Sequence, residues 1–283
     1  MTHLPTPGRT VVMGILNVTP DSFSDGGEHL NRDAAIAHGL RLLAEGADVI
    51  DVGGESTRPG AERAPVAIEL ARVLPVVTEL AGRGAVVSVD TMRAAVAARA
   101  VEAGAAIVND VSAGLADPAM LETVAGLGVG YVAMHWRGHS DVMQSLTGYG
   151  DVVAEVVSAL AERRDAALAA GVSSDNLVLD PGLGFAKTAV HNWELLRHLD
   201  QLASLGQPLL IGASRKRFLG ELLAVAGLPR PPKQRDDATV ALTALLAMKE
   251  VWGVRTHTVA AQRDAIAVAQ RLSLRSGDPR GLE

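Results

Sequence analysis

The arrangement that most restricts the fold of this chain is a short apolar run, rich in β-branched residues, that recurs about eight times and ends each time in a polar residue. These runs lie at positions 11–18, 49–52, 86–89, 107–108, 131–134, 177–179, 209–211 and 254. Segments with helical spacing, rich in Ala, Leu, Glu and Arg, separate them at 33–45, 66–81, 94–103, 118–127, 151–170, 192–202, 237–250 and 261–274. Strands that alternate with helices indicate right-handed βαβ units and a parallel sheet. Eight such units predict a single-domain α/β fold, a closed (β/α)8 barrel of the TIM type.

Length and composition agree with one barrel. The chain has 283 residues, which is long for an ordinary domain but common for a single α/β barrel. Hydrophobic residues make up 48% of the chain and aromatic residues only 3%, so the core must consist of Ala, Val, Leu and Ile. We expect the barrel to span residues 10–274, with loose tails at 1–9 and 275–283.

The composition also excludes several kinds of partner. The net charge is −6 and no long cationic run occurs, so a nucleic-acid partner is not expected. Without cysteine the chain can form no disulfide, thiolate nucleophile or cysteine metal site. No run approaches the ~20 apolar residues of a membrane span, and the N-terminus lacks the features of a signal peptide. We therefore expect a cytoplasmic protein that acts on small molecules and has no membrane partner.

The polar residues that end the apolar runs are expected to share one pocket. In a (β/α)8 barrel the carboxyl ends of all strands meet at one face, where the active site lies. The strand-to-helix loops at 21–32, 53–65, 137–150 and 181–190 are long and rich in glycine, whereas the helix-to-strand loops look short. This asymmetry places the chemistry at the carboxyl face of the barrel.

The stretch from Asn17 to Gly27 follows the first strand and combines an amide, two carboxylates, three hydroxyls and a Gly-Gly pair. An amide or carboxylate oxygen there could hold Mg²⁺, which prefers hard oxygen ligands and often shares them with substrate phosphates. An ordinary turn would use the same residue types, because Asn, Asp, Ser and Gly also dominate loops. The residues alone leave both interpretations open.

Three strand ends carry polar side chains with no local partner: Asp90, Asn109 and Asp180. Such groups lose solvation in a barrel mouth unless a donor meets them, so they indicate a ligand that supplies donors. A planar heterocycle with an amino-amide edge would satisfy all three. The alternative is helix N-capping, which suits Asp90 better than Asp180, since Pro-Gly-Leu-Gly follows the latter.

Cationic residues gather after the last two strands and in the loop after the second. The string from Ser214 to Arg217, together with Arg255 and His257, lies where barrels frequently bind phosphate, and Arg58 adds a guanidinium among hydroxyls. In an acidic chain this local positive charge suits an anionic substrate and leaving group. A surface ion pair, or basic residues at the start of an exposed helix, would explain the same residues without a ligand.

Other catalytic motifs find little support. The sequence at 180–188 is similar to a phosphate-binding loop but lacks the glycine before its lysine, which argues against an NTPase. Its Phe185 can form an apolar wall. His135 ends the fifth strand alone and is expected to be a satisfied structural group. No His-Glu-x-x-His string and no Gly-x-Ser-x-Gly elbow occurs, so zinc and serine hydrolysis are not expected.

Eight short strings follow one another along residues 10–272 in a specific order. They are Asn-Val-Thr-Pro-Asp-Ser-Phe-Ser-Asp-Gly-Gly at 17–27, Asp-Val-Gly-Gly-Glu-Ser-Thr-Arg-Pro-Gly at 51–60, Ser-Val-Asp-Thr at 88–91, Asn-Asp-Val-Ser at 109–112, Met-His at 134–135, Asp-Pro-Gly-Leu-Gly-Phe-Ala-Lys at 180–187, Gly-Ala-Ser-Arg-Lys at 212–216 and Arg-Thr-His at 255–257. Together they resemble the dihydropteroate synthase family. One string would be weak evidence, whereas all of them in family order are specific.

The resemblance implies condensation of 6-hydroxymethyl-7,8-dihydropterin pyrophosphate with 4-aminobenzoate, which gives 7,8-dihydropteroate and pyrophosphate in folate biosynthesis. By this resemblance Asn17 holds Mg²⁺ against the pyrophosphate, which Arg255 and His257 contact. Arg255 also stacks on the pterin face. The pterin edge is bound, and its pocket lined, by Asp90, Asn109, Met134, Asp180 and Lys216. The catalytic residues are then Asp90, which stabilises positive charge at the pterin methylene, together with Lys216 and Arg255.

The resemblance also places the second substrate. The residues that form the 4-aminobenzoate side, where sulfonamides compete in this family, are Thr57, Arg58, Pro59, Phe185, Ser214 and Lys216. A loop that covers this side carries Asp21, Phe23 and Asp25. Family members are commonly homodimers joined through late helices, and the stretch 237–248 could serve this role, although a core-facing helix would look alike.

One position departs from the family pattern. The last motif usually reads Arg-Val-His-Asp, and Thr258 stands here in place of the acid. If that acid orients the histidine or caps the final helix, Thr258 substitutes in part, and we expect activity to remain. The rival enzyme is a pterin-binding methyltransferase domain, which has no reason to carry both loops, 17–27 and 55–60. A non-catalytic pterin-binding paralogue is the alternative from another class, and it would be expected to lose the cationic residues.

Overall fold

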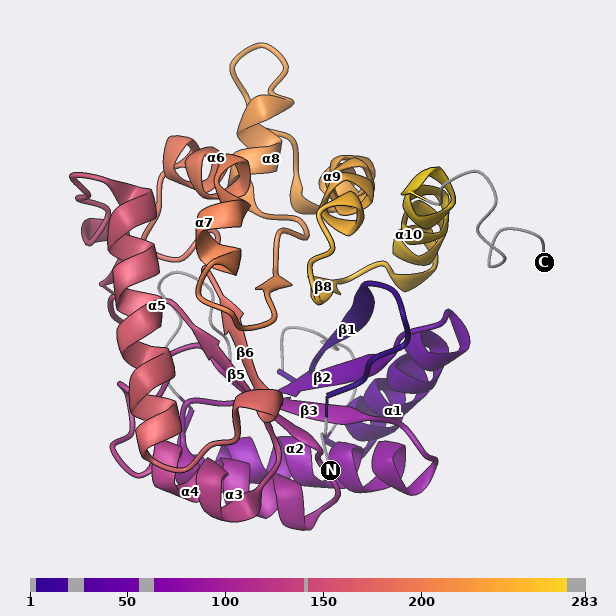
Figure 1. Ribbon diagram of the computed structural model, residues 1–283. Coiled ribbons are helices and arrows are strands. Elements are labelled where there is room, and N and C mark those ends of the chain that lie inside the picture. The colour runs from indigo at the N-terminus through magenta and orange to yellow at the C-terminus, as the bar shows by residue number, and fades with distance from the viewer. Residues whose placement is uncertain (1–3, 20–27, 56–63, 140–141, 274–283) are drawn as a thin grey trace.

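A computed structural model describes residues 4–19, 28–55, 64–139 and 142–273. Within these residues eight parallel strands curl into a barrel that helices surround (Figure 1). The strands are β1 (Val11–Asn17), β2 (Val49–Gly53), β3 (Val87–Asp90), β4 (Ile107–Asp110), β5 (Gly130–Met134), β6 (Leu177–Asp180), β7 (Leu210–Ile211) and β8 (Gly253–Thr256). They pair in the order β6-β5-β4-β3-β2-β1-β8-β7. The amide of Leu179 in β6 donates to the carbonyl of Pro208 at 2.9 Å, which closes the ring next to β7. The predicted (β/α)8 barrel is confirmed.

The helices follow the strands as the sequence predicts, with two differences. They are α1 (Glu28–Ala44), α2 (Val66–Gly82), α3 (Ala94–Glu102), α4 (Met120–Leu127), α5 (Val152–Ala169), α6 (Ala189–Arg197), α7 (Leu199–Ala203), α8 (Arg217–Leu222), α9 (Asp236–Met248) and α10 (Val259–Ser273). The single helix predicted at 192–202 is two helices, because His198 takes φ −110° and ψ 36° and interrupts the helical backbone. The sequence did not predict α8, which is too short, at 6 residues, to show a periodic pattern.

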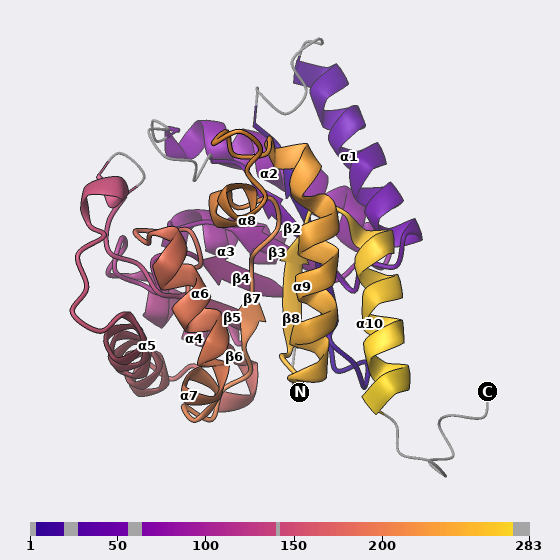
Figure 2. The same ribbon diagram turned by 90° about the horizontal axis from the view of Figure 1, so that it is seen from above.

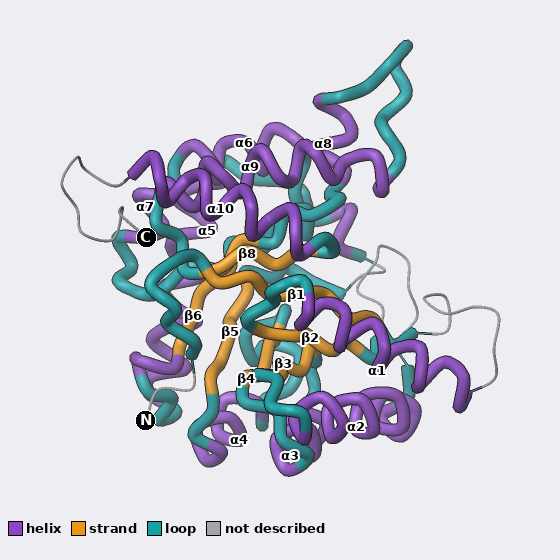
Figure 3. The backbone as a smooth tube through the Cα atoms, turned by 90° about the vertical axis from the view of Figure 1, so that its right-hand side faces the viewer, coloured by secondary structure: helices purple, strands orange, loops and turns teal. Residues whose placement is uncertain are grey.

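The aliphatic core has two parts, one inside the barrel and one between the strands and the helices. Val11 and Met13 of β1 belong to the inner cluster, while Val12 and Leu16 of the same strand belong to the outer one. This alternation follows from the two-residue period of a strand, whose successive side chains point to opposite faces. Helices pack along the outside of the strands (Figure 3), and the side chains on both faces of β1 and β2 are buried.

The segment before β1 is not the loose tail that the sequence predicted. Leu4 is buried in the inner cluster, and Pro5 accepts a hydrogen bond from the indole of Trp252 at 3.1 Å. Arg9 pairs with Asp48 at 2.6 Å. A single apolar residue shows no periodicity, so no pattern in the sequence predicts that Leu4 packs inside the barrel near the amino end of β5. Residues 1–3 and the predicted tail at 275–283 lie outside the described residues.

The segment that contains α8 extends away from the body beyond the helical ring (Figures 1 and 3). The described helices include none that is both long and apolar enough to cross a membrane.

Candidate active site

The register of the strands brings the predicted polar residues together at the carboxyl end of the barrel. Asp90 of β3 lies opposite Asn109 of β4, and Met134 of β5 lies opposite Asp180 of β6. Asp90, Asn109, Met134 and Asp180 are all buried. Parallel strands in register place equivalent positions side by side, so a shared pocket follows from the closed barrel itself.

Arg255 of β8 connects the two sides of this pocket. Its Nε donates to Oδ2 of Asp51 at 2.6 Å, and its Nη2 donates to Oδ2 of Asp90 at 2.7 Å. Asn109 Nδ2 donates to the same oxygen of Asp51 at 3.1 Å. Burial acts to lower the pKa of Arg255, but the carboxylates of Asp51 and Asp90 outweigh it and raise the pKa above its ordinary value. The guanidinium is therefore a fixed cation.

Asp90 pairs with Arg255 in this pocket and does not cap a helix. The amide of Ala94, at the start of α3, donates to Asp117 at 2.8 Å. Burial raises the pKa of Asp90 to about 7, and the Arg255 guanidinium opposes that rise. Because Asp117, and not Asp90, accepts from the first amide of α3, the capping alternative for Asp90 is excluded. The pKa near 7 means that the Asp90 carboxylate titrates near neutral pH.

Asp180 and Lys216 face one another across Gly212. A Cβ added to Gly212 would lie 3.8 Å from Asp180 Oδ2, 3.8 Å from Lys216 Nζ and 3.9 Å from Arg255 Cβ. Asp180 Oδ1 accepts a hydrogen bond from the amide of Gly182 at 2.7 Å. Burial lowers the pKa of Lys216 to about 8, although Asp180 opposes the change, and burial raises the pKa of Asp180. One oxygen of Asp180 holds the following loop, which leaves Oδ2 for a ligand.

The cationic side of the pocket continues around Lys216. Its ammonium donates to the carbonyl of Leu183 and lies 4.8 Å from the centre of the Phe185 ring. Ser214 Oγ lies 3.0 Å from His257 Nδ1 and accepts from the His257 amide at 3.2 Å. These contacts bring the predicted residues of the sixth, seventh and eighth strands to one side of the mouth.

Asn17 ends β1 beside the same pocket. A Cβ added to Gly53 would lie 3.5 Å from Asn17 Oδ1 and 3.5 Å from Asp90 Cβ. The amide oxygen is a hard donor of the kind that Mg²⁺ prefers. In the described part of the chain no three His, Asp or Glu side chains form a group that could hold a metal ion. Asn17 Oδ1 is thus an oxygen at the pocket that could serve as a ligand of Mg²⁺, and the metal itself stays a prediction.

Some predicted residues are not placed in the pocket. Those that lie outside the described residues are Asp21, Phe23, Asp25, Thr57, Arg58 and Pro59. Arg217, which follows the cationic string, is 82% exposed and pairs with Glu221 at 2.6 Å on α8. The alternative of basic residues at the start of an exposed helix is correct for Arg217.

Sequence analysis missed Asp51 as a site residue. It lies within the second apolar run, whereas the predicted site residues of this unit follow the run. The signal was the two-residue period of β2, which turns Asp51 inward between the outward residues Ile50 and Val52. A charge on the inner face of a barrel strand needs a partner, and Arg255 supplies it.

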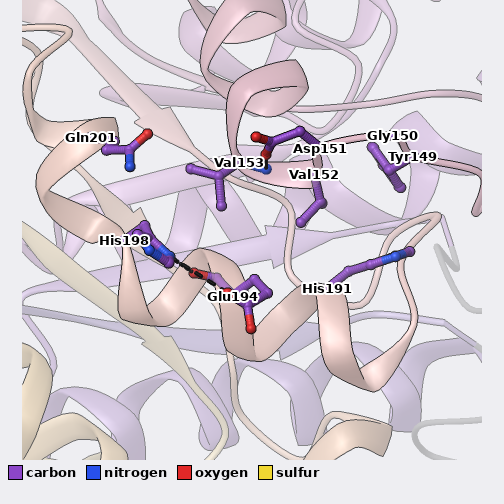
Figure 4. A pocket seen from close by; sticks show the side chains of 9 residues that line it. All are labelled: Tyr149, Gly150, Asp151, Val152, Val153, His191, Glu194, His198 and Gln201. Carbon is purple, nitrogen blue, oxygen red and sulfur yellow. Dashed lines mark hydrogen bonds and ion pairs between the residues drawn. The ribbon is translucent and has the colours of Figure 1, made fainter.

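A separate cleft of about 410 Å³ lies away from the barrel mouth. The start of α5 and the helices α6 and α7 surround it (Figure 4). Its lining includes Tyr149, Asp151, His191, Glu194 and His198. It contains none of the residues predicted for the site, so the candidate site is the mouth of the barrel and not this cleft.

The fold and the site define a (β/α)8 barrel protein with strand-end carboxylates and a fixed arginine at its mouth, where barrel enzymes have their active sites. Residues 13–257 match the family model described as pterin binding enzyme. A curated dihydropteroate synthase from Mycobacterium leprae is 56% identical over 259 residues, which are 91% of each chain. The chain belongs to the dihydropteroate synthase family.

Solved structures agree with this assignment. The Xanthomonas albilineans dihydropteroate synthase with 4-aminobenzoic acid has 48% identity and a TM-score of 0.88, and the match covers 95% of this chain and 94% of that one. The same enzyme in complex with 7,8-dihydropteroate has 45% identity and a TM-score of 0.86, with 96% and 97% covered.

Proposed function

We propose that this protein condenses 6-hydroxymethyl-7,8-dihydropterin pyrophosphate with 4-aminobenzoate to give 7,8-dihydropteroate and pyrophosphate, a transferase reaction of folate biosynthesis. The observation that carries the proposal is that Arg255 binds both Asp51 and Asp90 at the mouth of the barrel. Asn109 and Asp180 lie in the same mouth. Relatives of this chain hold 4-aminobenzoic acid and 7,8-dihydropteroate in their solved structures.

The pterin edge suits the polar groups of the pocket. An aminopyrimidinone presents N–H donors on one side, which carboxylate oxygens such as Asp180 Oδ2 can accept, and a carbonyl that Lys216 can meet. Asn109 offers both a donor and an acceptor, and Met134 supplies apolar contact beside Asp180. We assign the pterin to Asp90, Asn109, Met134, Asp180 and Lys216, with the guanidinium of Arg255 stacked on its face.

The chemical step needs charge stabilisation more than a strong base. The bond between the pterin methylene and the pyrophosphate oxygen breaks, the amine nitrogen of 4-aminobenzoate bonds to the methylene, and that nitrogen then loses a proton. Positive charge develops on the pterin as pyrophosphate departs, and the Asp90 carboxylate would stabilise it. A neutral aromatic amine can attack without prior deprotonation, so no enzyme nucleophile is required.

The leaving group is an anion, and the proposal assigns its contacts to Arg255, His257 and Asn17. When bound, Mg²⁺ would neutralise charge on the departing pyrophosphate and orient it. Asn17 would supply the protein oxygen that holds the metal at this position. A protein without the Asn17 side chain should therefore require a higher Mg²⁺ concentration for half-maximal rate.

The 4-aminobenzoate side is assigned to the wall that Phe185, Ser214 and Lys216 form. The Phe185 ring offers an apolar face for the aromatic ring of the substrate, and Lys216 lies 4.8 Å from its centre, at the border between this wall and the pterin pocket. Thr57, Arg58 and Pro59, and the loop with Asp21, Phe23 and Asp25, stay predictions for the same side.

Thr258 is compatible with activity. Its hydroxyl accepts from Gln262 Nε2 at 3.1 Å, and its amide donates to Thr256 Oγ1 at 3.3 Å, at the start of α10. The residue thus supports the first turn of this helix, one of the two tasks considered for the usual acid. We expect a modest change in rate from Thr258→Asp and no gain of a missing activity.

A direct assay tests the proposed function. Purified protein is given both substrates and Mg²⁺, and pyrophosphate release is measured with and without 4-aminobenzoate. Release that depends on both substrates is expected, and a chelator should suppress it. A protein that binds the pterin but releases no pyrophosphate would be a non-catalytic paralogue. Methyl transfer to a cobalamin protein without pyrophosphate release would favour the methyltransferase alternative.

We also propose that two copies associate through α9 and α10, which lie side by side on the surface (Figure 2). The outer faces of these helices carry exposed apolar side chains: Leu245 at 61%, Met248 at 51%, Val268 at 59% and Leu272 at 70%. Clustered apolar side chains of this kind mark protein interfaces. Light scattering should give the mass of a dimer, and Leu245→Glu should shift this mass toward that of a monomer.

The cytoplasmic location stays a prediction.

A further inference from the structure

A buried lysine that the proposed reaction does not use lies beneath the pocket. Lys187 is 7% exposed, and its ammonium lies 2.9 Å from His135 Nδ1, 3.1 Å from the Gly182 carbonyl and 3.1 Å from the Phe185 carbonyl. Two carbonyl oxygens thus accept from this nitrogen, and His135 Nδ1 is its third partner. A buried polar group in this state is fully satisfied and strongly fixed.

The two carbonyls belong to one tight turn. The amide of Phe185 donates to the Gly182 carbonyl at 3.1 Å, which defines the 182–185 turn. Lys187 therefore reaches back and binds the carbonyls at both ends of the 182–185 turn. Gly182 has φ +66°, and a Cβ there would lie 2.5 Å from the carbonyl oxygen of His135. The turn packs directly on the end of β5, and Lys187 holds it there.

The 182–185 turn in its position shapes the pocket wall. The Leu183 carbonyl accepts from the Lys216 ammonium, and the Phe185 ring lies 4.8 Å from the same nitrogen. A Cβ added to Gly184 would lie 3.0 Å from Lys216 Cδ, so the turn fits closely around this side chain. Any shift of the turn must move Phe185 and disturb Lys216.

His135 completes the arrangement from β5. Burial, together with the positive charges of Lys187 and Arg137, lowers the pKa of His135 to about 2, so its imidazole is neutral. A neutral ring can accept at Nδ1 from a lysine ammonium, and it can equally donate to a neutral amine. In both cases the two carbonyls of the turn still receive N–H donors from Lys187. The contacts of Lys187 with His135 and the two carbonyls are therefore the same whether the Lys187 amine is charged or neutral.

We propose that Lys187, held against His135, is a positioning residue that fixes the 182–185 turn and through it the 4-aminobenzoate wall. The inference rests on the proposed function for the identity of the substrate that meets this wall. Lys187 itself lies under the turn and does not touch the substrate. Its loss leaves Phe185 and Lys216 in the protein but no longer fixes them in place.

Steady-state kinetics of Lys187→Met tests the proposal. Methionine keeps the length of the side chain and removes its donors. We expect the KM for 4-aminobenzoate to rise about tenfold, with a smaller change in kcat, because the wall is displaced while the groups around the methylene stay. The matched control is Asn176→Ala, which removes a buried hydrogen bond of 3.1 Å to the Gly128 carbonyl at the opposite end of β6. It should lower the melting temperature and leave both KM values unchanged.

A lower melting temperature for Lys187→Met with both KM values and kcat unchanged would overturn the proposal, since the lysine would then act on stability alone. A pair of milder variants covers the case in which Lys187→Met does not fold. His135→Asn keeps an acceptor where Nδ1 lies, and His135→Leu does not. We expect a KM near that of the wild type for the first and a raised KM for the second, and equal KM values would refute the role of the contact.

A further measurement separates this proposal from the proposed function. If the wild-type protein releases no pyrophosphate, the function fails, and the turn is followed instead by amide hydrogen exchange in the peptide 181–188. Faster exchange in Lys187→Met than in the wild type and Asn176→Ala would support the positioning role. Unchanged exchange in that peptide would overturn it.

Discussion

The carboxylate of Asp180 divides its two oxygens between the fold and the ligand, and this division can be tested. Oδ1 accepts from the Gly182 amide at 2.7 Å, while Oδ2 makes no hydrogen bond within the described residues and lies near Lys216. In Asp180→Asn the amide oxygen can keep the bond to Gly182. The NH₂ group then takes the place of Oδ2 and faces the N–H donors of the pterin edge.

The expected loss follows from that single oxygen. Removal of a charged acceptor from a buried hydrogen bond costs ~1.5–3 kcal/mol, which corresponds to roughly 10- to 150-fold in the dissociation constant. Stability should respond differently. Burial raises the folded-state pKa of Asp180, so its ionised form opposes folding above the unfolded-state pKa. Asparagine removes that charge, and we expect an equal or higher melting temperature in the absence of ligand.

Calorimetric titration of dihydropterin pyrophosphate, without 4-aminobenzoate, measures the change. The control is Asp48→Asn at the other end of the barrel, where Asp48 accepts from Arg9 and from the Val12 amide at 2.8 Å. It should lower the melting temperature and leave pterin affinity intact. An Asp180→Asn protein that binds the pterin as tightly as the wild type would remove Asp180 from the site.

Three other outcomes follow from the structure. The kcat/KM for pterin pyrophosphate should rise with pH as Asp90 ionises near pH 7 and fall as Lys216 loses its proton near pH 8. A kcat/KM that does not change with pH across this range would contradict both assignments. Leu4→Ala should lower the free energy of unfolding in urea by about 2 kcal/mol with activity retained, because it opens a cavity at the end of the barrel opposite the candidate site. Asp51→Ala should lower the free energy of unfolding in urea by ~3–5 kcal/mol and also weaken pterin binding, since Arg255 loses its buried partner. Normal pterin affinity in a folded Asp51→Ala protein would argue against a positioning role for Asp51.

Individual elements show how far sequence patterns reach. The strand β8 was located from Val254 and the charged residues after it, and its position is confirmed. The helix α8 was missed because a helix of 6 residues contains less than two full turns. Leu4 was assigned to a tail because burial of a lone residue depends on what lies opposite it in space. Local patterns identify elements that are long and regular, and they fail for short or isolated contacts.

The amino-acid sequence by itself determined the alternation of strands and helices, the end of the barrel that carries chemistry, and the order of motifs that places the chain in its family. Those properties are local, since each depends on residues within one element and the loop after it. The tertiary structure alone decided that Arg255 binds Asp51, a residue 204 positions away, and that Lys187 reaches His135, 52 positions away. Closure of the barrel brings such residues within 3 Å or so of one another. Their partners are set by strand register and side-chain direction, which no stretch of sequence contains.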